Sequence, residues 1–351
     1  MRESCGQINP FSQSVHRRAR FLRLPRWVGR GALVPFMLLL AALCLPACSG
    51  IKKRPGLLEV LLPKPTGPMT VVSYNIRYGT ASDGQNSWKN RRELLLASVR
   101  TLRPDVLCLQ EALVFQVDEL ASELSMTPIG VGRDDGASAG EFTAILYRTD
   151  RFTHQADRDK SLGSGTFWLS PTPSVPGSKG WGATLPRTAT LADLKELSSG
   201  KYLQIYNLHL DHKSERARQE SVELLSRIML ERRRAGVPVI VAGDFNALPD
   251  SSTITYMLGL SPRAVTSPVA STEPVPAPRL VDSVLQASPN LAAHGTYHAF
   301  SGRIDGPRID FIFADRALSS SASGVDTTAD VARYPSDHFA VWATFDWPIK
   351  P

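Results

Sequence analysis

Apolar and polar positions along the chain alternate between short runs typical of strands and longer runs with helical spacing. The short apolar runs begin at Met69 and predict strands at 70–74, 106–109, 141–147, 202–209, 237–242, 309–313 and 339–345. Apolar residues three and four positions apart predict helices at 88–102, 113–124 and 215–234. Because strands and helices are intermixed, we expect an α/β or α+β domain.

The first part of the chain departs from this alternation. Residues 1–47 contain seven arginines and no lysine, and an apolar run follows the arginines at 31–45. A basic region followed by an apolar region is typical of a secretory signal. The apolar run contains Pro35 and is shorter than the roughly 20 residues that a membrane-spanning helix needs. We therefore expect residues 1–47 to be a signal peptide.

The end of this signal resembles the cleavage site of bacterial lipoproteins through the residues Leu45-Pro46-Ala47-Cys48. The resemblance implies that Cys48 is lipidated and becomes the first residue of the mature chain. Residues 48–68 contain four prolines and are expected to form a tether, which leaves one domain at 69–351. An ordinary cleaved signal peptide and an uncleaved anchor are the alternatives.

Under this interpretation the protein lies in the bacterial cell envelope, lipid-anchored and either periplasmic or surface-exposed. Ser49 after the lipidated cysteine favours the outer membrane. Cys5 and Cys44 leave with the signal, and a lipidated Cys48 leaves Cys108 alone, so we expect no intramolecular disulfide. Cys108 lies in an apolar, strand-like run and is expected to be an inert buried thiol.

The formal charge of +7 is concentrated in the signal peptide. Residues 1–47 hold seven of the 40 basic residues and one of the 33 acidic residues, which leaves 33 basic and 32 acidic residues in 48–351. A nearly neutral mature chain does not support a basic surface for nucleic acid. Nucleic acid therefore stays a possible partner that the charge does not favour.

Polar side chains that could bind a metal or move protons recur at the ends of the predicted strands. They are Asn75, Glu111, His209, Asp211, Asp244, Asn246, Asp310, Asp337 and His338. A single residue of this kind usually caps a turn, but Asp310 is flanked by Ile309 and Phe311 and is costly to bury without a partner such as a histidine. Together they are the groups that a hard divalent cation and a phosphate ester need.

In this order the set closely resembles the endonuclease/exonuclease/phosphatase superfamily, from about Met69 to Trp347. The most specific motifs are Gly243-Asp244-Phe245-Asn246 and Ser336-Asp337-His338. The resemblance implies a four-layer α/β/β/α sandwich, like that of deoxyribonuclease I. It also implies a site at one end of two packed sheets.

The resemblance further implies a role for each acid and amide. Glu111 is expected to hold Mg²⁺, or alternatively Mn²⁺, with Asn75 beside it and Asp337 holding or orienting a second ion. Asp244 is expected to orient or deprotonate the attacking water, and Asn246 to contact the phosphoryl oxygens. Phosphoryl transfer needs such cations, an activated water and donors on the phosphoryl oxygens.

The two histidines are expected to stabilise the phosphate from opposite sides. The resemblance implies that Asp310 holds His338 through a hydrogen bond and that Glu141 orients His209. A carboxylate behind an imidazole fixes its tautomer and raises its basicity. Asp211 is expected to support the site through hydrogen bonds.

For three further residues the sequence leaves two interpretations open. Arg187 either binds phosphate or is a charge on a strand surface. Trp181 either stacks on a ring of the substrate or packs at a sheet edge. His212 either opens a helix or belongs to the site.

The sequence therefore predicts a divalent-metal-dependent phosphoesterase, either a phosphodiesterase or a phosphatase, that uses water attack outside the cytoplasm. A secreted nuclease and a sphingomyelinase-like phospholipase are alternatives within this class. A non-catalytic binding lipoprotein on the same scaffold is the alternative from another class. We expect a monomer whose partners are a phosphate-ester substrate and, through Cys48, the membrane.

Overall fold

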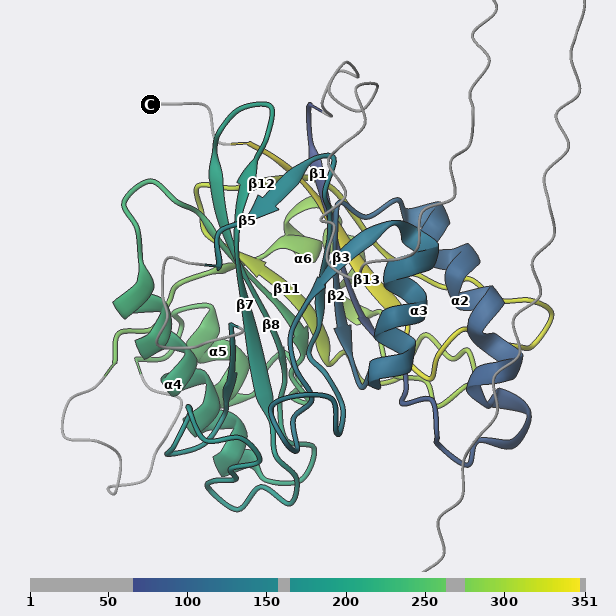
Figure 1. Cartoon of the computed structure of the whole chain (residues 1–351). Helices are drawn as coiled ribbons and strands as arrows, with labels where there is room; N and C mark the ends of the chain where they lie inside the picture. Colours follow the sequence, from purple (N-terminus) through teal and green to yellow (C-terminus); the bar gives the residue numbers. More distant parts are fainter. Residues whose placement is uncertain (1–65, 157–164, 263–274, 348–351) are drawn as a thin grey trace, which may run out of the picture. The chain divides into compact units, whose positions relative to one another are not determined.

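The computed structural model describes residues 66–156, 165–262 and 275–347 (Figure 1). The expected signal peptide, the lipidation site at Cys48 and nearly all of the tether lie outside the described residues. Within the described part of the chain, no helix has the length and apolar character needed to cross a membrane.

Two sheets form the centre of the domain. The first contains, in spatial order, β12 (Ser319–Asp326), β13 (Ala340–Asp346), β1 (Met69–Asn75), β2 (Val106–Gln110), β4 (Ile145–Arg148) and β3 (Met126–Ile129). The second contains β10 (Val281–Asp282), β11 (Asp310–Ala314), β9 (Val239–Asp244), β8 (Tyr202–His209), β7 (Thr188–Glu196) and β5 (Phe152–His154), and β6 (Thr166–Trp168) also pairs with β7.

Each sheet has one parallel pair at its middle, and these two pairs bring the site residues together. Asn75 at the end of β1 pairs with Gln110 at the end of β2. His209 at the end of β8 pairs with Asp244 at the end of β9. The carboxyl ends of parallel strands meet at one edge of a sheet, so residues distant in the sequence become neighbours there.

Helices cover the outer face of each sheet (Figure 1). The helices α2 (Trp88–Leu102) and α3 (Val114–Leu124) pack on the first sheet, whereas α4 (Glu215–Arg232) and α5 (Ser252–Met257) pack on the second. Shorter elements are α6 (Ser283–Ala287) and the 3₁₀ helices η1 (Gly84–Asn86) and η4 (Pro289–Ala293). The four-layer α/β/β/α sandwich is confirmed.

Each sheet has a hydrophobic core beneath its helices, and a third hydrophobic core lies between the two sheets. It contains Val71 from β1 and Ile205 from β8, whereas Val72, the neighbour of Val71, packs beneath the helices of the first sheet. This division follows from the alternation of side chains along a strand. Cys108 is buried in the inner core, where burial raises the pKa of its thiol, in agreement with an inert role.

Buried amides connect the two sheets near the site. The Nε2 of Gln110 donates to Oδ1 of Asn207 on β8 at 2.7 Å. Asn207 in turn donates through Nδ2 to the carbonyl oxygens of Leu109 and Ala144, both at 2.8 Å. Because these buried groups bond to one another across the interior, they fix how the strands of one sheet lie against those of the other.

The predicted strand at 141–147 is wrong in its first half. Regular pairing begins only at Ile145, and the segment before it contributes a single bridge between Phe142 and Ala112. The Thr143 hydroxyl bonds instead to the hydroxyls of Thr188 and Thr190 on β7, each at 3.1 Å. This irregular segment carries Glu141 into the site.

Candidate active site

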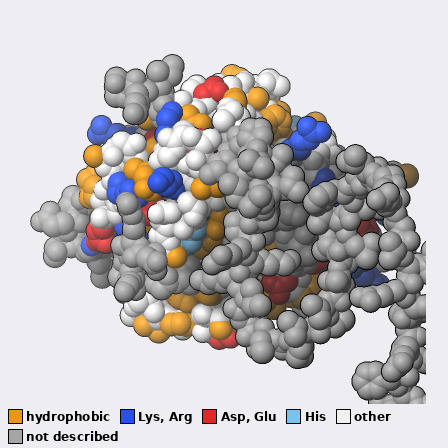
Figure 2. All heavy atoms as spheres, turned by 45° about the horizontal axis from the view of Figure 1, so that its top comes forward, with side chains coloured by type: hydrophobic (Ala, Val, Ile, Leu, Met, Phe, Trp, Pro, Cys, Tyr) orange, Lys and Arg blue, Asp and Glu red, His pale blue; other side chains and the backbone are white. Residues whose placement is uncertain are grey.

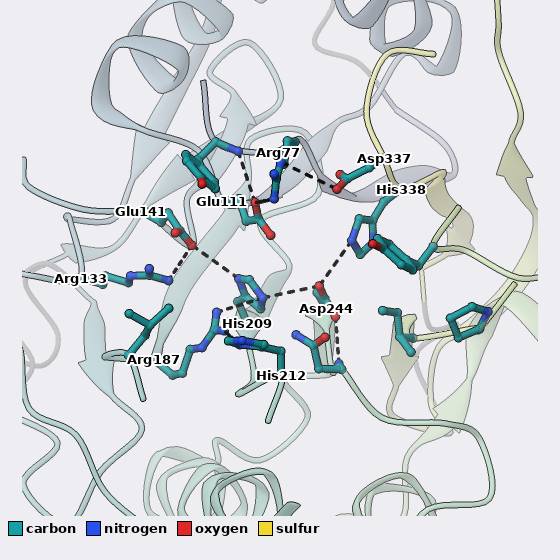
Figure 3. Close-up of a pocket in the computed structure, with 16 residues that line it drawn as sticks. Arg77, Glu111, Arg133, Glu141, Arg187, His209, His212, Asp244, Asp337 and His338 are labelled. Atoms are coloured by element: carbon teal, nitrogen blue, oxygen red, sulfur yellow. Dashed lines mark hydrogen bonds and ion pairs between the residues drawn. The ribbon is translucent and has the colours of Figure 1, made fainter. Parts of the chain in front are cut away.

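A cavity of about 560 Å³ lies where these strands end (Figure 3). Eight of the residues predicted for the site line it: Glu111, Glu141, Arg187, His209, Asp244, Asn246, Asp337 and His338. Further lining residues are Arg77, Tyr78, Arg133, Leu185, His212, Tyr297, Pro307 and Ile309. Asn75 and Asp310 do not line the cavity and are hydrogen-bonded to residues that do.

Three residues of the cavity have left-handed backbone conformations. The φ angles are 55° at Arg77, 60° at Glu111 and 46° at Asn246. Each residue directly follows or closely follows a strand, and such angles are costly for residues other than glycine. Asn75 Oδ1 accepts the amide of Arg77 at 3.1 Å, and Asp244 Oδ1 accepts the amide of Asn246 at 2.8 Å, so side chains stabilise two of these turns.

The amide of Asn75 joins two carboxylates that belong to different sheets. Its Nδ2 donates to Oε1 of Glu111 at 3.1 Å and to Oδ2 of Asp244 at 3.0 Å. Its Oδ1 already accepts the amide of Arg77. Asn75 therefore sets the separation of Glu111 and Asp244, which is a positioning role beside the ion-binding role that we expected.

Asp244 is the acid best suited to accept a proton. It is 1% exposed, and burial followed by the nearby Asp310 raises the pKa of its carboxyl to about 7. A general base works best with a pKa near the working pH. Asn246 lies two residues further along and lines the same cavity, so the expected pair of water-activating acid and phosphate-contacting amide is brought together.

His338 is held as an imidazolium. Its Nδ1 is 2.9 Å from Oδ2 of Asp310, and its Nε2 is 3.9 Å from Oδ2 of Asp244. Burial alone would lower the pKa of the imidazole, but Asp310 and then Asp244 outweigh burial and raise it to about 10. The predicted hydrogen bond between Asp310 and His338 is present, and the imidazolium is a donor for a phosphoryl oxygen.

His209 is in the opposite state. Its Nε2 accepts a hydrogen bond from Nη1 of Arg187 at 3.0 Å, and its Nδ1 lies 4.0 Å from Oε2 of Glu141. Burial, then Arg187 and Arg133, lower the pKa of His209 well below its usual value. A neutral imidazole adds no positive charge, so the positive charge on this side of the cavity comes from Arg187 and from Arg133, which is paired with Glu141.

Arg187 lines the cavity and is not a charge on a strand surface. Its Nη2 donates to Nδ1 of His212 at 2.8 Å, and its buried Nε has no hydrogen-bond partner among the described residues. Asp211 Oδ2 lies 3.8 Å from that Nε, while Asp211 Oδ1 accepts the amides of Lys213 and Ser214 at the start of α4. Asp211 thus supports Arg187 from behind.

The structure places the other two residues with open interpretations differently with respect to the cavity. His212 lines the cavity, whereas Trp181 does not. The backbone carbonyl of Trp181 accepts the hydroxyl of Ser214 at 2.9 Å. Arg133, which the sequence did not single out, donates through Nη1 to Oε2 of Glu141 at 2.6 Å. Burial raises the pKa of Glu141 to about 7.

Oxygen donors for a hard divalent cation are gathered on one side of the cavity. Glu111, Asp244 and Asp337 present carboxylates there, which is the donor chemistry that Mg²⁺ and Mn²⁺ prefer. Among the described residues, Asp244, Asp310 and His338 also bring ligand atoms within 4.8 Å of one another. Because Asp310 and His338 already form an ion pair, Glu111 is the better residue to hold an ion.

Comparisons with known proteins agree with this geometry. The sequence profile of the Endonuclease/Exonuclease/phosphatase family matches residues 72–338. The structure of a protein of this family from Bacteroides thetaiotaomicron is 32% identical, with a TM-score of 0.67 and coverage of 81% of this chain and 100% of that chain. A mannosyl-6-phosphatase from the same organism is 32% identical, with a TM-score of 0.66 and coverage of 80% and 100%.

A more distant relative is Protein angel of Drosophila melanogaster, which is 28% identical over 188 residues. That match covers 49% of this chain and 48% of the relative, so this chain spans about half the length of the fly protein. The family profile, in contrast, spans every residue that we place at the cavity and every strand of the two sheets except β13 and the first three residues of β1. The chain belongs to the endonuclease/exonuclease/phosphatase family and is a phosphoester hydrolase.

Proposed function

We propose that this protein is a divalent-metal-dependent phosphatase that hydrolyses small phosphomonoesters by water attack. The observation that carries the proposal is the position of Asp244 between two unlike histidines, 3.5 Å from Nε2 of neutral His209 and 3.9 Å from Nε2 of cationic His338. A base in this position can take a proton from the water that attacks phosphorus. The cationic ring beside it can stabilise the phosphoryl oxygens, which gain negative charge during the attack.

The cation balance supports a monoester as the substrate. A phosphomonoester carries close to two negative charges at neutral pH, whereas a diester carries one. His338 supplies one fixed positive charge, and Arg187 supplies another on the opposite side, whereas the cavity arginines Arg77 and Arg133 are paired with Asp83 and Glu141. Arginine has five N–H donors, and only two of those of Arg187 are hydrogen-bonded to imidazole nitrogens. Nη1 and Nη2 each have one further N–H that is available to a phosphoryl oxygen, whereas Nε is buried beside Asp211.

The size and walls of the cavity support a small substrate. Its volume of about 560 Å³ is within the range of sites for small molecules. Tyr297, Pro307 and Ile309 give it an apolar wall against which a sugar or another organic group can pack. The mannosyl-6-phosphatase described above has the same fold, and the activity in its name is consistent with a sugar phosphate as the substrate class.

The steps of the reaction can be assigned to residues of this chain. Asp244 accepts a proton from water as the water attacks phosphorus, and Asn75 keeps that carboxylate in place. The bond from phosphorus to the ester oxygen breaks, and this oxygen takes a proton from the solvent and leaves as the alcohol. His338 and Arg187 donate to the phosphoryl oxygens. Glu111 is the residue that would hold Mg²⁺ or Mn²⁺, and such an ion when bound neutralises charge that develops on the phosphate.

One face of the molecule and the charge composition of the chain give no support to a nuclease. On the face shown in Figure 2, described basic and acidic side chains lie in small separate groups among apolar and uncharged ones. A protein that follows a phosphate backbone needs a continuous row of cations. This agrees with the nearly equal numbers of basic and acidic residues after position 47.

We also propose that the protein is a monomer attached to the membrane of the cell envelope through a lipid on Cys48. The support comes from the basic and apolar residues before Cys48 and the prolines after it. Labelling of the full chain with a radioactive fatty acid tests this. The label is expected on the wild type and absent from Cys48→Ala, and an equally labelled variant would refute it.

Hydrolysis of matched substrates tests the proposed function. We would compare p-nitrophenyl phosphate, bis-p-nitrophenyl phosphate and mannose 6-phosphate, each with Mg²⁺, with Mn²⁺ and with EDTA. Monoesters are expected to react faster than the diester, EDTA to stop the reaction, and Asp244→Asn to remove it. The matched control is Asp305→Asn, which changes an exposed aspartate paired with Arg303. Faster diester hydrolysis, or full activity of Asp244→Asn, would contradict the proposal.

A further inference from the structure

The guanidinium of Arg77 lies between two carboxylates of the cavity (Figure 3). Its Nη1 is 4.0 Å from Oε2 of Glu111, and its Nε is 3.9 Å from Oδ2 of Asp337. The topology explains this position. In the first sheet β1 lies between β13 and β2, and Arg77 follows β1, Glu111 follows β2 and Asp337 precedes β13.

The side chain of Arg77 is fixed by Asp83. Nε and Nη2 of Arg77 each donate to one carboxylate oxygen of Asp83 at 3.0 Å. A bidentate pair of this kind orients the guanidinium as well as binding it. The positive charge is therefore held in one place, and its distance to Glu111 and Asp337 is determined by the fold.

The backbone of Arg77 is fixed as well. Its carbonyl accepts Nη2 of Arg91 at 2.8 Å and Nε2 of Gln116 at 3.2 Å, and its amide donates to Asn75. The φ angle of 55° is costly for arginine and persists only where the surrounding structure determines it. Such a strained and well-supported residue indicates a functional position.

Glu111 and Asp337 differ in what surrounds their second oxygen. Oε1 of Glu111 is linked through the Asn75 amide to Asp244, so on this side two carboxylates lie close together. Asp337 Oδ1 instead is the acceptor for the hydroxyl of Ser336 at 3.3 Å, and its Oδ2 faces Arg77. Two resident cations, His338 and then Arg77, thus oppose the effect of burial, which raises the pKa of the Asp337 carboxyl.

We propose that Arg77 is a built-in cation that takes the place of a second metal ion, so that the site binds one divalent cation, through Glu111, and Asp337 is not a ligand. The proposal rests on the metal dependence of the proposed function. A fixed positive charge about 4 Å from both carboxylates opposes an ion between them and leaves the side toward Asp244 for the single ion. It replaces our expectation that Asp337 holds or orients a second ion.

Counting bound Mn²⁺ by electron paramagnetic resonance tests this on the purified, metal-stripped chain. The wild type is expected to bind one ion. Glu111→Gln is expected to weaken binding by about a hundredfold or more, because it removes the principal carboxylate. Asp337→Asn is expected to keep one ion, with a loss of less than about tenfold, because only a distant charge is lost.

Two substitutions at Arg77 separate its charge from its shape. Arg77→Met is expected to tighten Mn²⁺ binding by about tenfold or more, because the repelling charge is removed, whereas Arg77→Lys stays near the wild type. The matched control is Arg333→Met, which removes an exposed arginine paired with Asp330. Thermal melts in EDTA verify that each variant is folded.

The outcomes separate this proposal from the proposed function. Two ions in the wild type, loss of the ion in Asp337→Asn as in Glu111→Gln, or unchanged affinity in Arg77→Met would each overturn the role of Arg77. Weaker inhibition by inorganic phosphate in Arg77→Met with unchanged Mn²⁺ affinity would instead make Arg77 a substrate contact. A wild type that binds no Mn²⁺ would overturn the metal dependence itself, together with the proposal that rests on it.

Discussion

Arg187 donates a hydrogen bond to His209, with 3.0 Å between Nη1 of the arginine and Nε2 of the imidazole. The arginine thereby fixes the ring as the tautomer with its proton on Nδ1, directed toward Glu141. The family resemblance implied that His209 stabilises charge on the phosphate, but His209 is neutral. Arg187, for which the sequence left two interpretations open, carries the positive charge. This relationship determines how the left-hand side of the cavity in Figure 3 works.

Replacing Arg187 is therefore expected to impair turnover strongly. Arg187→Gln removes the charge and the donor to His209, and kcat/KM for phosphomonoesters should fall by about 10² to 10³. Arg187→Lys keeps the charge but not the planar pair of donors and should recover only part of the activity.

Steady-state kinetics of these variants would be compared with Arg303→Gln, which removes an exposed arginine paired with Asp305. The control should retain wild-type kinetics. Wild-type kinetics in Arg187→Gln would show that Arg187 does not act on the substrate, and His209 would then have to be the positive group.

The close approach of β8 and β9 at Gly243 predicts a sensitive position. A Cβ on Gly243 would lie 2.1 Å from the carbonyl oxygen of Leu208, and the φ of Gly243 is 148°. Gly243→Ala should lower the free energy of unfolding by about 3 kcal/mol or more and displace Asp244, the next residue. Urea unfolding and kinetics would measure both effects.

Gly236→Ala is the matched control for that substitution. Gly236 also has a positive φ, 72°, but no atom lies within 4 Å of a Cβ placed there. Its alanine variant should lose about 1 kcal/mol and keep full activity. Equal effects of the two substitutions would show that the contact with Leu208 is unimportant.

The hydrogen bonds that Asn207 makes between the two sheets predict that replacing it lowers the free energy of unfolding, although Asn207 does not line the cavity. Asn207→Leu removes the donor to Leu109 and Ala144 and the acceptor of Gln110, all of them buried. Leaving such groups without partners should cost about 2 to 4 kcal/mol in urea unfolding. Asn90→Leu, at an exposed helix position, should change stability by about 0.5 kcal/mol or less.

Acid sensitivity is expected from His298. Burial, followed by the charge of His338, lowers the pKa of His298 to about 4, and Nε2 of His298 has no hydrogen-bond partner among the described residues. The unfolded chain binds this proton below about pH 6.5, whereas the folded chain does so only below about 4. The contribution of His298 to stability is thus intact above pH 6.5 and is lost as the pH falls toward 4.

Measuring the free energy of unfolding at pH 7 and pH 5 would check this. The decrease should be smaller in His298→Gln than in the wild type, because glutamine does not titrate. His294→Gln, at a half-buried histidine, is the control and should keep the wild-type decrease. An identical decrease in the wild type and in His298→Gln would contradict the prediction.

The sequence predicts those helices and strands whose own residues show the spacing of apolar positions typical of that element. The helix at 88–102 has apolar residues at helical spacing and ends before Pro104, and the structure has the same bounds. The polar strand β12 (Ser319–Asp326) was not predicted, because its sequence has no alternation of apolar residues. It forms because β13 supplies the hydrogen bonds of an antiparallel partner.

The same distinction applies to the site. Asp244 and His338 belong to local motifs, so they could be predicted from the sequence. Arg77 and Arg133 acquire their roles only when distant strands bring Glu111, Asp337 and Glu141 beside them, and no local pattern marks them. The charge state of a histidine likewise depends on neighbours that only the folded chain supplies.

Isotope transfer from water is the decisive test of whether water activated by Asp244 attacks phosphorus. The wild type would hydrolyse p-nitrophenyl phosphate in H₂¹⁸O with Mg²⁺, and mass spectrometry would locate the label in a single turnover. We expect one ¹⁸O atom in the inorganic phosphate, none in p-nitrophenol, and no release of phosphate by Asp244→Asn. Label in p-nitrophenol, or wild-type release by Asp244→Asn, would contradict it.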